Sequence, residues 1–482
     1  MICERRSFDL VVLGGGPAGI LGAVTAANHG ATVALVDSHA ELGGAGVNTG
    51  TVPSKTLRET ALALSGFRSR NLYGVDLSLR REATVADFLR HEENVKHGLN
   101  SMLAERLESS SAVVFRGFGS FAGPNTILVR AGEEYLLTAG RVLIATGSSP
   151  LRPPIFPFDR PGVFDSDGVL ALERLPKKLA VIGGGVIGSE YACTFAALGA
   201  EVHLIDGRDV LLPFLDGEIS SALANAMQRS GIRFHWNERV ESCRVDKGAE
   251  IALGLRSGGA LACDAVLVAA GRKSNTGALN LAAAGVTADD RGLIRVDEQF
   301  RTEVSHIYAA GDVIGFPALA STSMQQARLA MTHAFGQAGS RQTPRVLPAG
   351  IYTIPEVGTV GDTEESLRAK GVYYVTGRWR YSDNARGRII GDQDGFLKLL
   401  FRCQDMRLMG AHAIGEQASE LVHIGMMAML TNSSAELFAD ACFNVPTLGE
   451  LYKTASIDAI SQLATSAPVA VQSETEYAYD ER

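Results

Sequence analysis

Two glycine-rich segments have the residue spacing that binds the pyrophosphate of a dinucleotide. Their glycines are Gly14, Gly16 and Gly19 in the first segment and Gly183, Gly185 and Gly188 in the second. Such glycines permit a tight turn and let backbone N–H groups approach a pyrophosphate at the positive N-terminus of the following helix. Because glycine turns are common, the spacing alone is weak evidence, and its weight depends on the surrounding elements.

Each segment has the surroundings that such a site needs. An apolar strand precedes each loop, and a helical pattern follows it. A second apolar strand then ends in an acid, Asp37 or Asp206, which can accept hydrogen bonds from a ribose. Residues 10–37 and 179–206 are identical at half of their positions without gaps. We interpret them as two copies of one nucleotide-binding unit rather than as part of a solenoid.

Two residues at the end of the second copy bear on which nucleotide binds there. Asp206 favours the 2′-hydroxyl of NAD and repels the 2′-phosphate of NADP. Arg208 stands two residues later, where its guanidinium could reach that phosphate, although an ordinary solvated loop arginine is an equally good interpretation. The sequence therefore leaves the choice between NAD and NADP open, and one site for both is compatible with it.

Three further apolar strands, each followed by a small turn, fit the same architecture. Their turn residues are Ala145, Thr146 and Gly147 in the first, Gly271 and Arg272 in the second, and Gly311 and Asp312 in the third. An aspartate at position 312 could bind the hydroxyls of a polyol or ribityl chain. The proline-rich stretch 150–157 is predicted to be a linker.

Length and composition limit the possible classes of protein. A chain of 482 residues is too long for one core, and its 53 glycines with 46% hydrophobic residues are typical of a compact α/β enzyme of about three domains. The net charge of −8 argues against nucleic-acid binding. The six cysteines show no CxxC spacing, so we expect no metal site and no disulfide framework.

The apolar run 8–27 is long enough to raise the question of a membrane span. Asp9, Pro17 and the glycine spacing instead favour a strand, a loop and a helix start. No small-residue cleavage site follows it, so a signal peptide is not predicted either. We therefore expect a cytoplasmic protein without membrane contact.

In this order, the segments resemble the flavoprotein disulfide reductase family, which includes lipoamide dehydrogenase, from residue 8 to about 463. The resemblance implies that FAD binds the first glycine unit, the turn 145–147 and the turn 311–312, and that a nicotinamide nucleotide binds the loop 183–188 and the turn 271–272. It also implies a homodimer. The expected fold is α/β, with two Rossmann-like dinucleotide-binding domains and an α+β C-terminal dimerisation domain.

Domain limits follow from the same resemblance. We expect an FAD-binding domain at 1–151 that resumes at 280–346, with an NAD(P)-binding domain inserted at 152–279. A dimerisation domain is expected at 347–466. The ending 467–482, with a proline and several acids, is predicted to be a disordered tail.

The departures from the family pattern concern its thiol chemistry. The family's disulfide reductases have a Cys-x4-Cys pair after the first nucleotide unit, and here Gly46 and Thr51 occupy those positions. They also have a histidine before a C-terminal proline, where this chain has Val445. Glycine and threonine cannot form a disulfide, and valine cannot carry a proton. Dithiol exchange by this route is therefore excluded.

The residues for hydride transfer between a flavin and a nicotinamide are retained. Lys55 and Glu190 resemble the family's catalytic ion pair beside the flavin, although each could be an ordinary helix-surface charge. The profile most resembles the transhydrogenase subset, which implies ping-pong hydride transfer between NADPH or NADH and NAD(P) through FAD. The alternatives are an NAD(P)H oxidase or quinone reductase, and a non-catalytic flavin-bound scaffold. The preferred nucleotide, the acceptor, the direction and any assembly beyond a dimer are left open.

Overall fold

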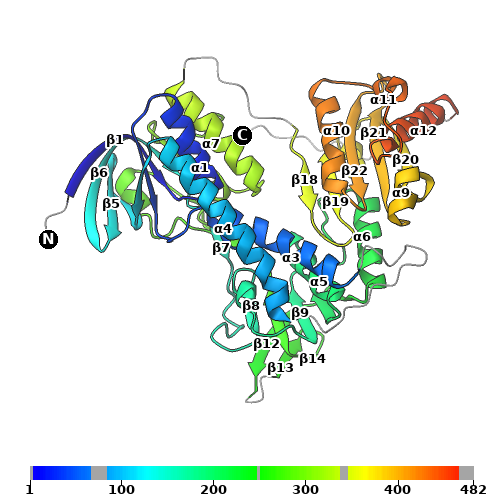
Figure 1. Cartoon of the computed structure of the whole chain (residues 1–482), viewed down its shortest axis with the longest axis horizontal. Coiled ribbons are helices and arrows are strands. Elements are labelled where there is room, and N and C mark those ends of the chain that lie inside the picture. Colours follow the sequence, from blue (N-terminus) through cyan, green and yellow to red (C-terminus); the bar gives the residue numbers. More distant parts are fainter. Residues whose placement is uncertain (1–3, 67–83, 247–249, 337–345, 466–482) are drawn as a thin grey trace.

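Three units, each built on its own sheet, make up the computed structural model, which describes residues 4–66, 84–246, 250–336 and 346–465 (Figure 1). The predicted tail 467–482 lies outside these ranges. The first two units have parallel strands flanked by helices, and the third combines an antiparallel sheet with helices. The α/β fold class predicted from the sequence is therefore confirmed.

The first unit is centred on the apolar strand before the first glycine loop. Its sheet has the order β3-β2-β1-β6-β5-β4, and β17 also pairs with β6. The strands are β1 (Glu4–Leu13), β2 (Val33–Asp37), β3 (Val113–Arg116), β4 (Phe118–Gly123), β5 (Thr126–Ala131), β6 (Glu133–Ile144) and β17 (Ile307–Ala309). Strand β1 begins before the predicted apolar run because the long β6 pairs with it from Glu4 onward.

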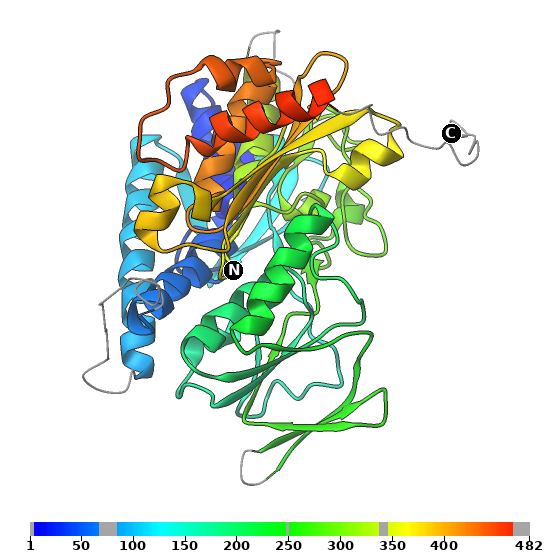
Figure 2. The same ribbon diagram turned by 90° about the vertical axis from the view of Figure 1, so that its right-hand side faces the viewer.

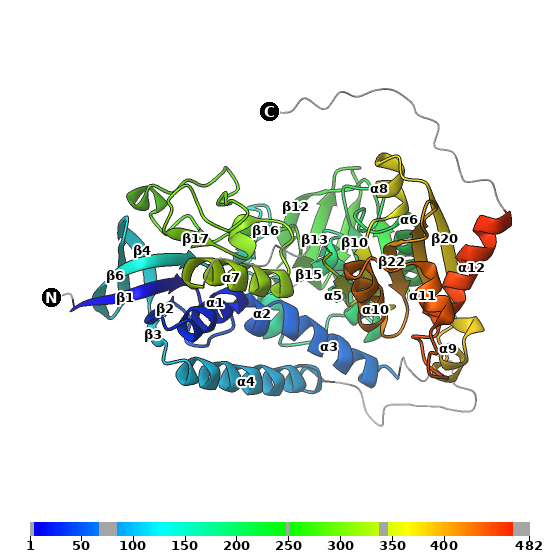
Figure 3. The ribbon, with the colours of Figure 1, turned by 90° about the horizontal axis from the view of Figure 1, so that it is seen from above.

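The helices of the first unit cover this sheet and lead away from it. They are α1 (Pro17–Asn28), α2 (Gly44–Asn48), α3 (Thr51–Leu64), α4 (Val85–Ser109) and α7 (Ala320–Phe335), with short 3-10 turns at Leu281–Ala284 and Asp312–Ile314. Helix α1 packs against α7, and α3 packs against α4 and α5. Seen from above, α3 extends from the first unit toward the other two (Figure 3). None of the described helices combines the length and the apolar character needed to cross a bilayer.

The second unit repeats the first on a smaller scale. Its parallel sheet has the order β11-β10-β9-β15-β8, and a separate antiparallel sheet has the order β12-β13-β14. The strands are β8 (Val163–Asp165), β9 (Lys178–Ile182), β10 (Glu201–Ile205), β11 (Arg233–His235), β12 (Val240–Val245), β13 (Ile251–Leu255), β14 (Ala260–Cys263) and β15 (Ala265–Val268), with helices α5 (Val186–Ala197) and α6 (Gly217–Arg229) and a 3-10 turn at Gly168–Ala171.

A two-stranded ribbon joins the second unit to the first. The chain leaves the first unit through β7 (Ser148–Pro150) and returns through β16 (Arg272–Ser274), and these strands pair in antiparallel fashion. The predicted linker 150–157 therefore starts inside β7, because Pro150 can stand at a sheet edge where no backbone N–H is needed.

The third unit packs on the second. Its sheet has the order β18-β19-β22-β21-β20. The strands are β18 (Ala349–Ile351), β19 (Val357–Gly361), β20 (Tyr374–Arg380), β21 (Phe396–Arg402) and β22 (Leu408–Ile414), with helices α8 (Glu364–Ala369), α9 (Ala385–Ile390), α10 (Ala418–Leu430), α11 (Ala435–Asp440) and α12 (Leu451–Thr465) and a 3-10 turn at Tyr381–Asp383. Helix α6 of the second unit lies against this sheet (Figure 2). One apolar core runs through both units, since Leu223 of α6 and Ile414 of β22 belong to the same cluster.

Candidate dinucleotide sites and the groups between them

The first glycine loop leaves room for a ligand at one of its three glycines. Gly14 has a φ of +104°, and a Cβ there would collide with the carbonyl of Ala145. A Cβ on Gly19 would collide with the carbonyl of Gly14. Among the described residues, the nearest atom to a Cβ on Gly16 is the Cα of Gly44 at 3.9 Å. Gly16 is the N-cap of α1 and brings no side-chain cap, so the free N–H groups of the helix fit a pyrophosphate.

The second loop repeats this division of roles. A Cβ on Gly183 or on Gly188 would meet backbone carbonyls, those of Ala269 and Gly183 respectively. A Cβ on Gly185 has no neighbour within 4 Å in the described part of the chain. Gly185 also begins α5 without a side-chain cap. The two loops therefore have the same packing and the same open side, as the internal repeat predicts.

The acids at the ends of β2 and β10 hold the glycine loops. Asp37 Oδ2 accepts a hydrogen bond of 2.5 Å from the Gly15 N–H, and Asp206 Oδ2 accepts one of 2.5 Å from Gly184. Asp37 Oδ1 also accepts the His39 N–H at 2.7 Å. Both side chains are buried, and their contact with the loop was not predicted from the sequence. Their predicted contact with a ribose stays a prediction.

Arg208 is partly exposed and pairs with the acid that stands two residues before it. Its Nε lies 2.8 Å from Asp206 Oδ1, and its Nη2 lies 2.7 Å from Asp206 Oδ2. Burial disfavours the charged carboxylate, but the hydrogen bonds from the Arg208 side chain and from backbone N–H groups outweigh it and lower the pKa of Asp206. Neither interpretation of Arg208 from the sequence included this bidentate pair, and its contact with a 2′-phosphate stays a prediction.

Ser148 connects two predicted site residues that lie far apart in the sequence. Its Oγ donates to Asp312 Oδ2 at 2.5 Å and accepts from Arg272 Nε at 2.8 Å. Arg272 Nη2 also donates to the Ser148 carbonyl at 2.6 Å. In this structure Arg272 therefore holds the ribbon strand β7. Sequence reasoning missed Ser148, although it directly follows the predicted turn 145–147.

Asn275, in the turn that directly follows β16, fixes the turn 145–147. Its Nδ2 donates to the Thr146 carbonyl at 3.0 Å, its N–H donates to the Gly147 carbonyl at 3.0 Å, and its own carbonyl accepts the Thr146 hydroxyl at 3.0 Å. Ala145 packs in the core of the first unit. Gly271, with a φ of +117°, accepts the Leu151 N–H at 2.9 Å. No local pattern in the sequence points to Asn275.

Gly311 marks the turn that leads to Asp312 and needs an unusual backbone conformation. Its φ is +83°, a region that favours glycine, and its N–H donates to Gln326 Oε1 at 2.9 Å. Asp312 directly follows this turn and begins a short 3-10 turn. The contact with Ser148 therefore brings the predicted flavin-side turns 145–147 and 311–312 together.

Lys55 of α3 and Glu190 of α5 form an ion pair between the first two units. Lys55 Nζ lies 2.9 Å from Oε1 and 2.7 Å from Oε2 of Glu190. Oε1 also accepts the Tyr352 N–H at 3.0 Å, and Lys55 Nζ lies 5.0 Å from the centroid of the Tyr352 ring. Glu190 is buried, whereas Lys55 keeps 26% of its side chain exposed. Glu190 thus holds in place an ammonium group that stays partly accessible.

The segment that lacks the cysteine pair is tightly packed at Gly46. A Cβ on Gly46 would lie 2.5 Å from Cγ of Pro17, the first residue of α1. Thr51 begins α3 with an exposed side chain. Among the described cysteines, burial raises the pKa of Cys193 and that of Cys263 to about 12 each. Val445 is exposed. A low-pKa thiol is therefore not found at this place in the described residues.

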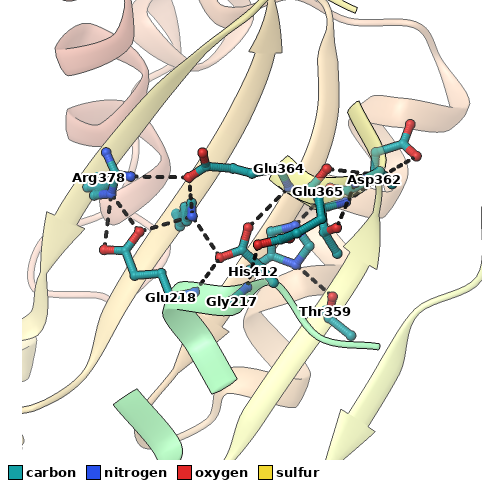
Figure 4. A network of polar contacts seen from close by, with 12 residues as sticks. Gly217, Glu218, Thr359, Asp362, Glu364, Glu365, Arg378 and His412 are labelled. Carbon is teal, nitrogen blue, oxygen red and sulfur yellow. Dashed lines mark hydrogen bonds and ion pairs between the residues drawn. The ribbon is translucent and has the colours of Figure 1, made fainter. Parts of the chain in front are cut away.

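A cluster of charges links the second unit to the third. We call Asp216, Glu218, Glu364, Arg378 and Lys398 the interdomain charge cluster (Figure 4). The buried Lys398 Nζ lies 2.7 Å from Asp216, 3.0 Å from Glu218 and 2.5 Å from Glu364. The three carboxylates have the spacing of metal ligands, but the Lys398 ammonium group already contacts all three.

Known proteins resemble the chain over almost all of its length. Residues 8–332 match the family described as pyridine nucleotide-disulphide oxidoreductase, and residues 347–456 match its dimerisation domain. The soluble pyridine nucleotide transhydrogenase of Mycobacterium tuberculosis is 42% identical over 95% of this chain and 98% of its own. That of Pseudomonas syringae is 39% identical over 95% of this chain and 99% of its own.

Solved structures of similar proteins superpose on the chain over almost all of its length. LpdA from Mycobacterium tuberculosis superposes with a TM-score of 0.86 at 27% identity, covering 94% of this chain and 99% of its own. The HOCl-induced flavoprotein disulfide reductase RclA from Escherichia coli superposes with a TM-score of 0.85 at 27% identity, covering 93% of this chain and 99% of its own.

Proposed function

The chain belongs to the pyridine nucleotide-disulphide oxidoreductase family, which is FAD-dependent, and we propose that it transfers hydride between NADPH or NADH and NAD(P) without a redox disulfide. Curated relatives with the name soluble pyridine nucleotide transhydrogenase support this proposal at 37–42% identity. A ping-pong cycle, in which one nucleotide leaves before the next binds, follows if both use the single loop 183–188.

One observation carries the proposal. The Lys55–Glu190 ion pair is present at 2.7 Å, while the neighbouring position 46 has no space for a cysteine side chain. A dithiol mechanism needs two thiols and a proton-transfer group, whereas hydride transfer needs alignment of two rings and a suitable electrostatic environment. The chain retains the ion pair that hydride transfer can use and lacks the cysteines and the histidine that a dithiol mechanism needs.

The proposed cofactor sites use residues of both glycine loops. The FAD site comprises Gly14, Gly16, Gly19, Asp37, Ala145, Thr146, Gly147, Gly311 and Asp312. The nicotinamide nucleotide site comprises Gly183, Gly185, Gly188, Asp206, Arg208, Gly271 and Arg272. FAD, when bound, would supply the group that accepts hydride from one nicotinamide and returns it to another. The open N-termini of α1 and α5 would hold the two pyrophosphates.

The protein groups near the proposed reaction site act by charge and position. Lys55 would place a positive charge at the flavin edge, and Glu190 would restrain the position of its ammonium group. Ser54 Oγ, at 3.3 Å from Glu190 Oε2, helps to fix the carboxylate. Ser148 would orient Asp312 toward the flavin side chain through their hydrogen bond. None of these groups needs to transfer a proton.

The domain limits inferred from the sequence fit this proposal. We propose an FAD-binding domain at 1–151 and 280–346, an NAD(P)-binding domain at 152–279 and a dimerisation domain at 347–466. The ribbon of β7 and β16 and the family match at 347–456 support these limits. We also propose a homodimer, which the dimerisation-domain match supports.

An anaerobic titration tests the function. Purified protein is titrated with NADPH and, separately, with NADH, and a thio-NAD analogue is then added while the flavin absorbance is followed. We expect either donor to bleach the flavin and the analogue to restore its colour with formation of reduced thio-NAD. Reoxidation by oxygen or a quinone alone would instead identify an oxidase or quinone reductase. Absence of bleaching by both donors would favour a non-catalytic scaffold.

A further inference from the structure

Asp206 uses its hydrogen-bonding capacity fully within the protein. A carboxylate offers about four acceptor sites, two on each oxygen. Oδ2 accepts the Gly184 N–H and Arg208 Nη2, and Oδ1 accepts the Arg208 N–H and Nε. A ribose hydroxyl can reach Asp206 only after the Arg208 side chain has moved away. That movement would free one site on each oxygen, which matches the two hydroxyls of an NAD(H) ribose.

The first copy of the nucleotide unit lacks this arrangement. His39 occupies the place of Arg208, and its N–H and Nδ1 both contact Asp37 Oδ1. Asp37 Oδ2 accepts only the Gly15 N–H among the described residues. The first copy therefore keeps a free acceptor site, and Arg116, the residue paired with Asp37 in the sheet, donates to the His39 carbonyl at 3.3 Å rather than to the Asp37 carboxylate. The difference between the copies points to an added role for the basic group at the second site.

A second arginine lies on the same loop from a different strand. The guanidinium of Arg239 lies beside Gly207, with its Nε only 3.1 Å from where a Cβ of residue 207 would stand. Glycine at this position therefore provides the space for the guanidinium. Within the described ranges, the Arg239 side chain makes no hydrogen bond or ion pair, and it is exposed. Among the described residues, it is a cation without a carboxylate partner, and it lies beside the glycine that separates Asp206 from Arg208 in the sequence.

Backbone hydrogen bonds keep Arg239 at this place. The segment after β11 is tied to the segment after β10 by Glu238 N–H to the Asp206 carbonyl at 3.0 Å and by Asn237 N–H to the Arg208 carbonyl at 3.1 Å. The nearby carboxylate of Glu238 accepts the N–H groups of Arg239 and Ser257 through Oε1, so it is directed at the backbone. The two guanidinium groups are thus held on adjoining segments.

We propose that Arg239 and Arg208 form a binding site for the 2′-phosphate of NADP(H) next to Asp206. This inference rests on the proposed binding of a nicotinamide nucleotide at the loop 183–188. With NADP(H), the phosphate draws Arg208 away from Asp206 and is held between two guanidinium groups. With NAD(H), the ribose hydroxyls occupy the sites on Asp206 that Arg208 vacates. Two positive charges against one negative charge offset the repulsion that Asp206 alone would exert on a phosphate.

Binding of two adenine nucleotides tests this site without hydride transfer. The holoenzyme is titrated calorimetrically with 2′,5′-ADP, which carries the 2′-phosphate, and with 5′-AMP, which lacks it. We expect Arg239→Ala to weaken 2′,5′-ADP by roughly tenfold or more, as the loss of a charged hydrogen bond implies, and to change 5′-AMP by less than about twofold. Arg208→Ala should also weaken 2′,5′-ADP selectively.

A matched control removes an arginine outside the site. Arg233 stands at the other end of β11, where it contacts Glu201, and Arg233→Ala should leave both affinities unchanged. An equal effect of Arg239→Ala on both ligands, or no effect on either, would overturn the proposal. Because these probes carry no nicotinamide, selective loss of 2′,5′-ADP without thio-NAD reduction would retain the phosphate site and reject the transhydrogenase function. If thio-NAD is reduced but Arg239→Ala affects both nucleotides equally, the transhydrogenase function would be retained and the phosphate site rejected.

Discussion

Lys55 and Glu190 are separated by 135 residues, yet the Lys55 ammonium contacts both oxygens of the Glu190 carboxylate, at 2.9 and 2.7 Å. The Tyr352 N–H donates to the same carboxylate. The contact thus joins α3 of the first unit, α5 of the second and the start of the third. A buried carboxylate of this kind is costly without its partner, so each unit depends on the others at this point.

Substitution of Lys55 tests its proposed electrostatic role. We expect Lys55→Met to slow anaerobic flavin reduction by NADH by roughly a hundredfold, the effect of removing one preorganised charged donor. The flavin midpoint potential should fall, because a positive charge near the flavin favours its electron-rich form. Lys55→Arg should keep most of the potential. Stopped-flow absorbance and a redox titration measure both quantities, and an unchanged potential in Lys55→Met would exclude the proposed role.

The two glycines of the second loop should respond differently to alanine. Gly185→Ala places a methyl group on the open side of the loop. We therefore expect an unchanged thermal unfolding temperature and a nucleotide affinity that is lower by roughly tenfold or more. Gly188→Ala forces a methyl group onto the Gly183 carbonyl and should destabilise the fold by about 1–3 kcal/mol. Calorimetry and thermal unfolding separate these effects. Equal stability losses in both variants would contradict the assigned open side.

The interdomain charge cluster makes stability depend on pH. Burial would raise the pKa of Asp216 and of Glu364, but hydrogen bonds from Lys398 outweigh it and lower both values. Their contribution is therefore complete above the usual carboxyl pKa of about 4 and is lost as the pH falls through the lowered values. Burial alone would lower the pKa of Lys398, but its hydrogen bonds to the carboxylates outweigh burial and raise the pKa. The contribution of Lys398 to stability is therefore complete below about pH 10 and is lost as the pH rises through the raised pKa.

Removal of Lys398 should reveal this window. We expect Lys398→Met to cost about 3–5 kcal/mol at pH 7, because three carboxylates lose their cation, and less near pH 4, where the acids become protonated. Denaturant unfolding of the holoenzyme across this range measures the difference. Lys370→Met, which removes an exposed partner of Asp362, should cost less than about 1 kcal/mol. A Lys398→Met penalty that grows toward low pH would contradict the expected direction of this dependence.

The thiols should behave as six independent cysteines. We expect all six to react with a thiol reagent in denaturant without prior reduction. In the native holoenzyme, alkylation should leave hydride transfer unchanged, since burial raises the pKa of Cys193 and Cys263. A count below six without reductant would indicate a disulfide. Gly46→Cys should destabilise the protein by about 1–3 kcal/mol, because its side chain would overlap Pro17.

The sequence was sufficient for elements whose chemistry is local. The glycine loops, their flanking strands and the acids Asp37 and Asp206 lie within single short segments, so the glycine spacing and its local surroundings together predict the turn and the helix start. The family resemblance supplied the Lys55–Glu190 pair from two such segments. The paired copies of one motif also made the fold class predictable, and the family matches confirm it.

Contacts between distant segments were not predictable in the same way. Ser148 and Asn275 gain their roles from the pairing of β7 with β16, which no local pattern encodes. Arg239 lies beside Gly207 because two loops are joined by backbone hydrogen bonds. The charge of Arg208 was readable from the sequence, but its bidentate contact with Asp206 depends on the rotamers that the two side chains adopt. Lys398 looks like any strand lysine until three carboxylates converge on it.

The ribbon of β7 and β16 has a consequence for how this architecture can diversify. Because entry and exit of the second unit are adjacent, that unit can be exchanged as a cassette while the first sheet keeps its strand order. Such an exchange would alter nucleotide choice without rebuilding the flavin side. A replacement unit would also have to supply acids equivalent to Glu190, which contacts Lys55, and to Asp216 and Glu218, which contact Lys398. The contacts with the third unit thereby limit which replacement units can yield a working enzyme.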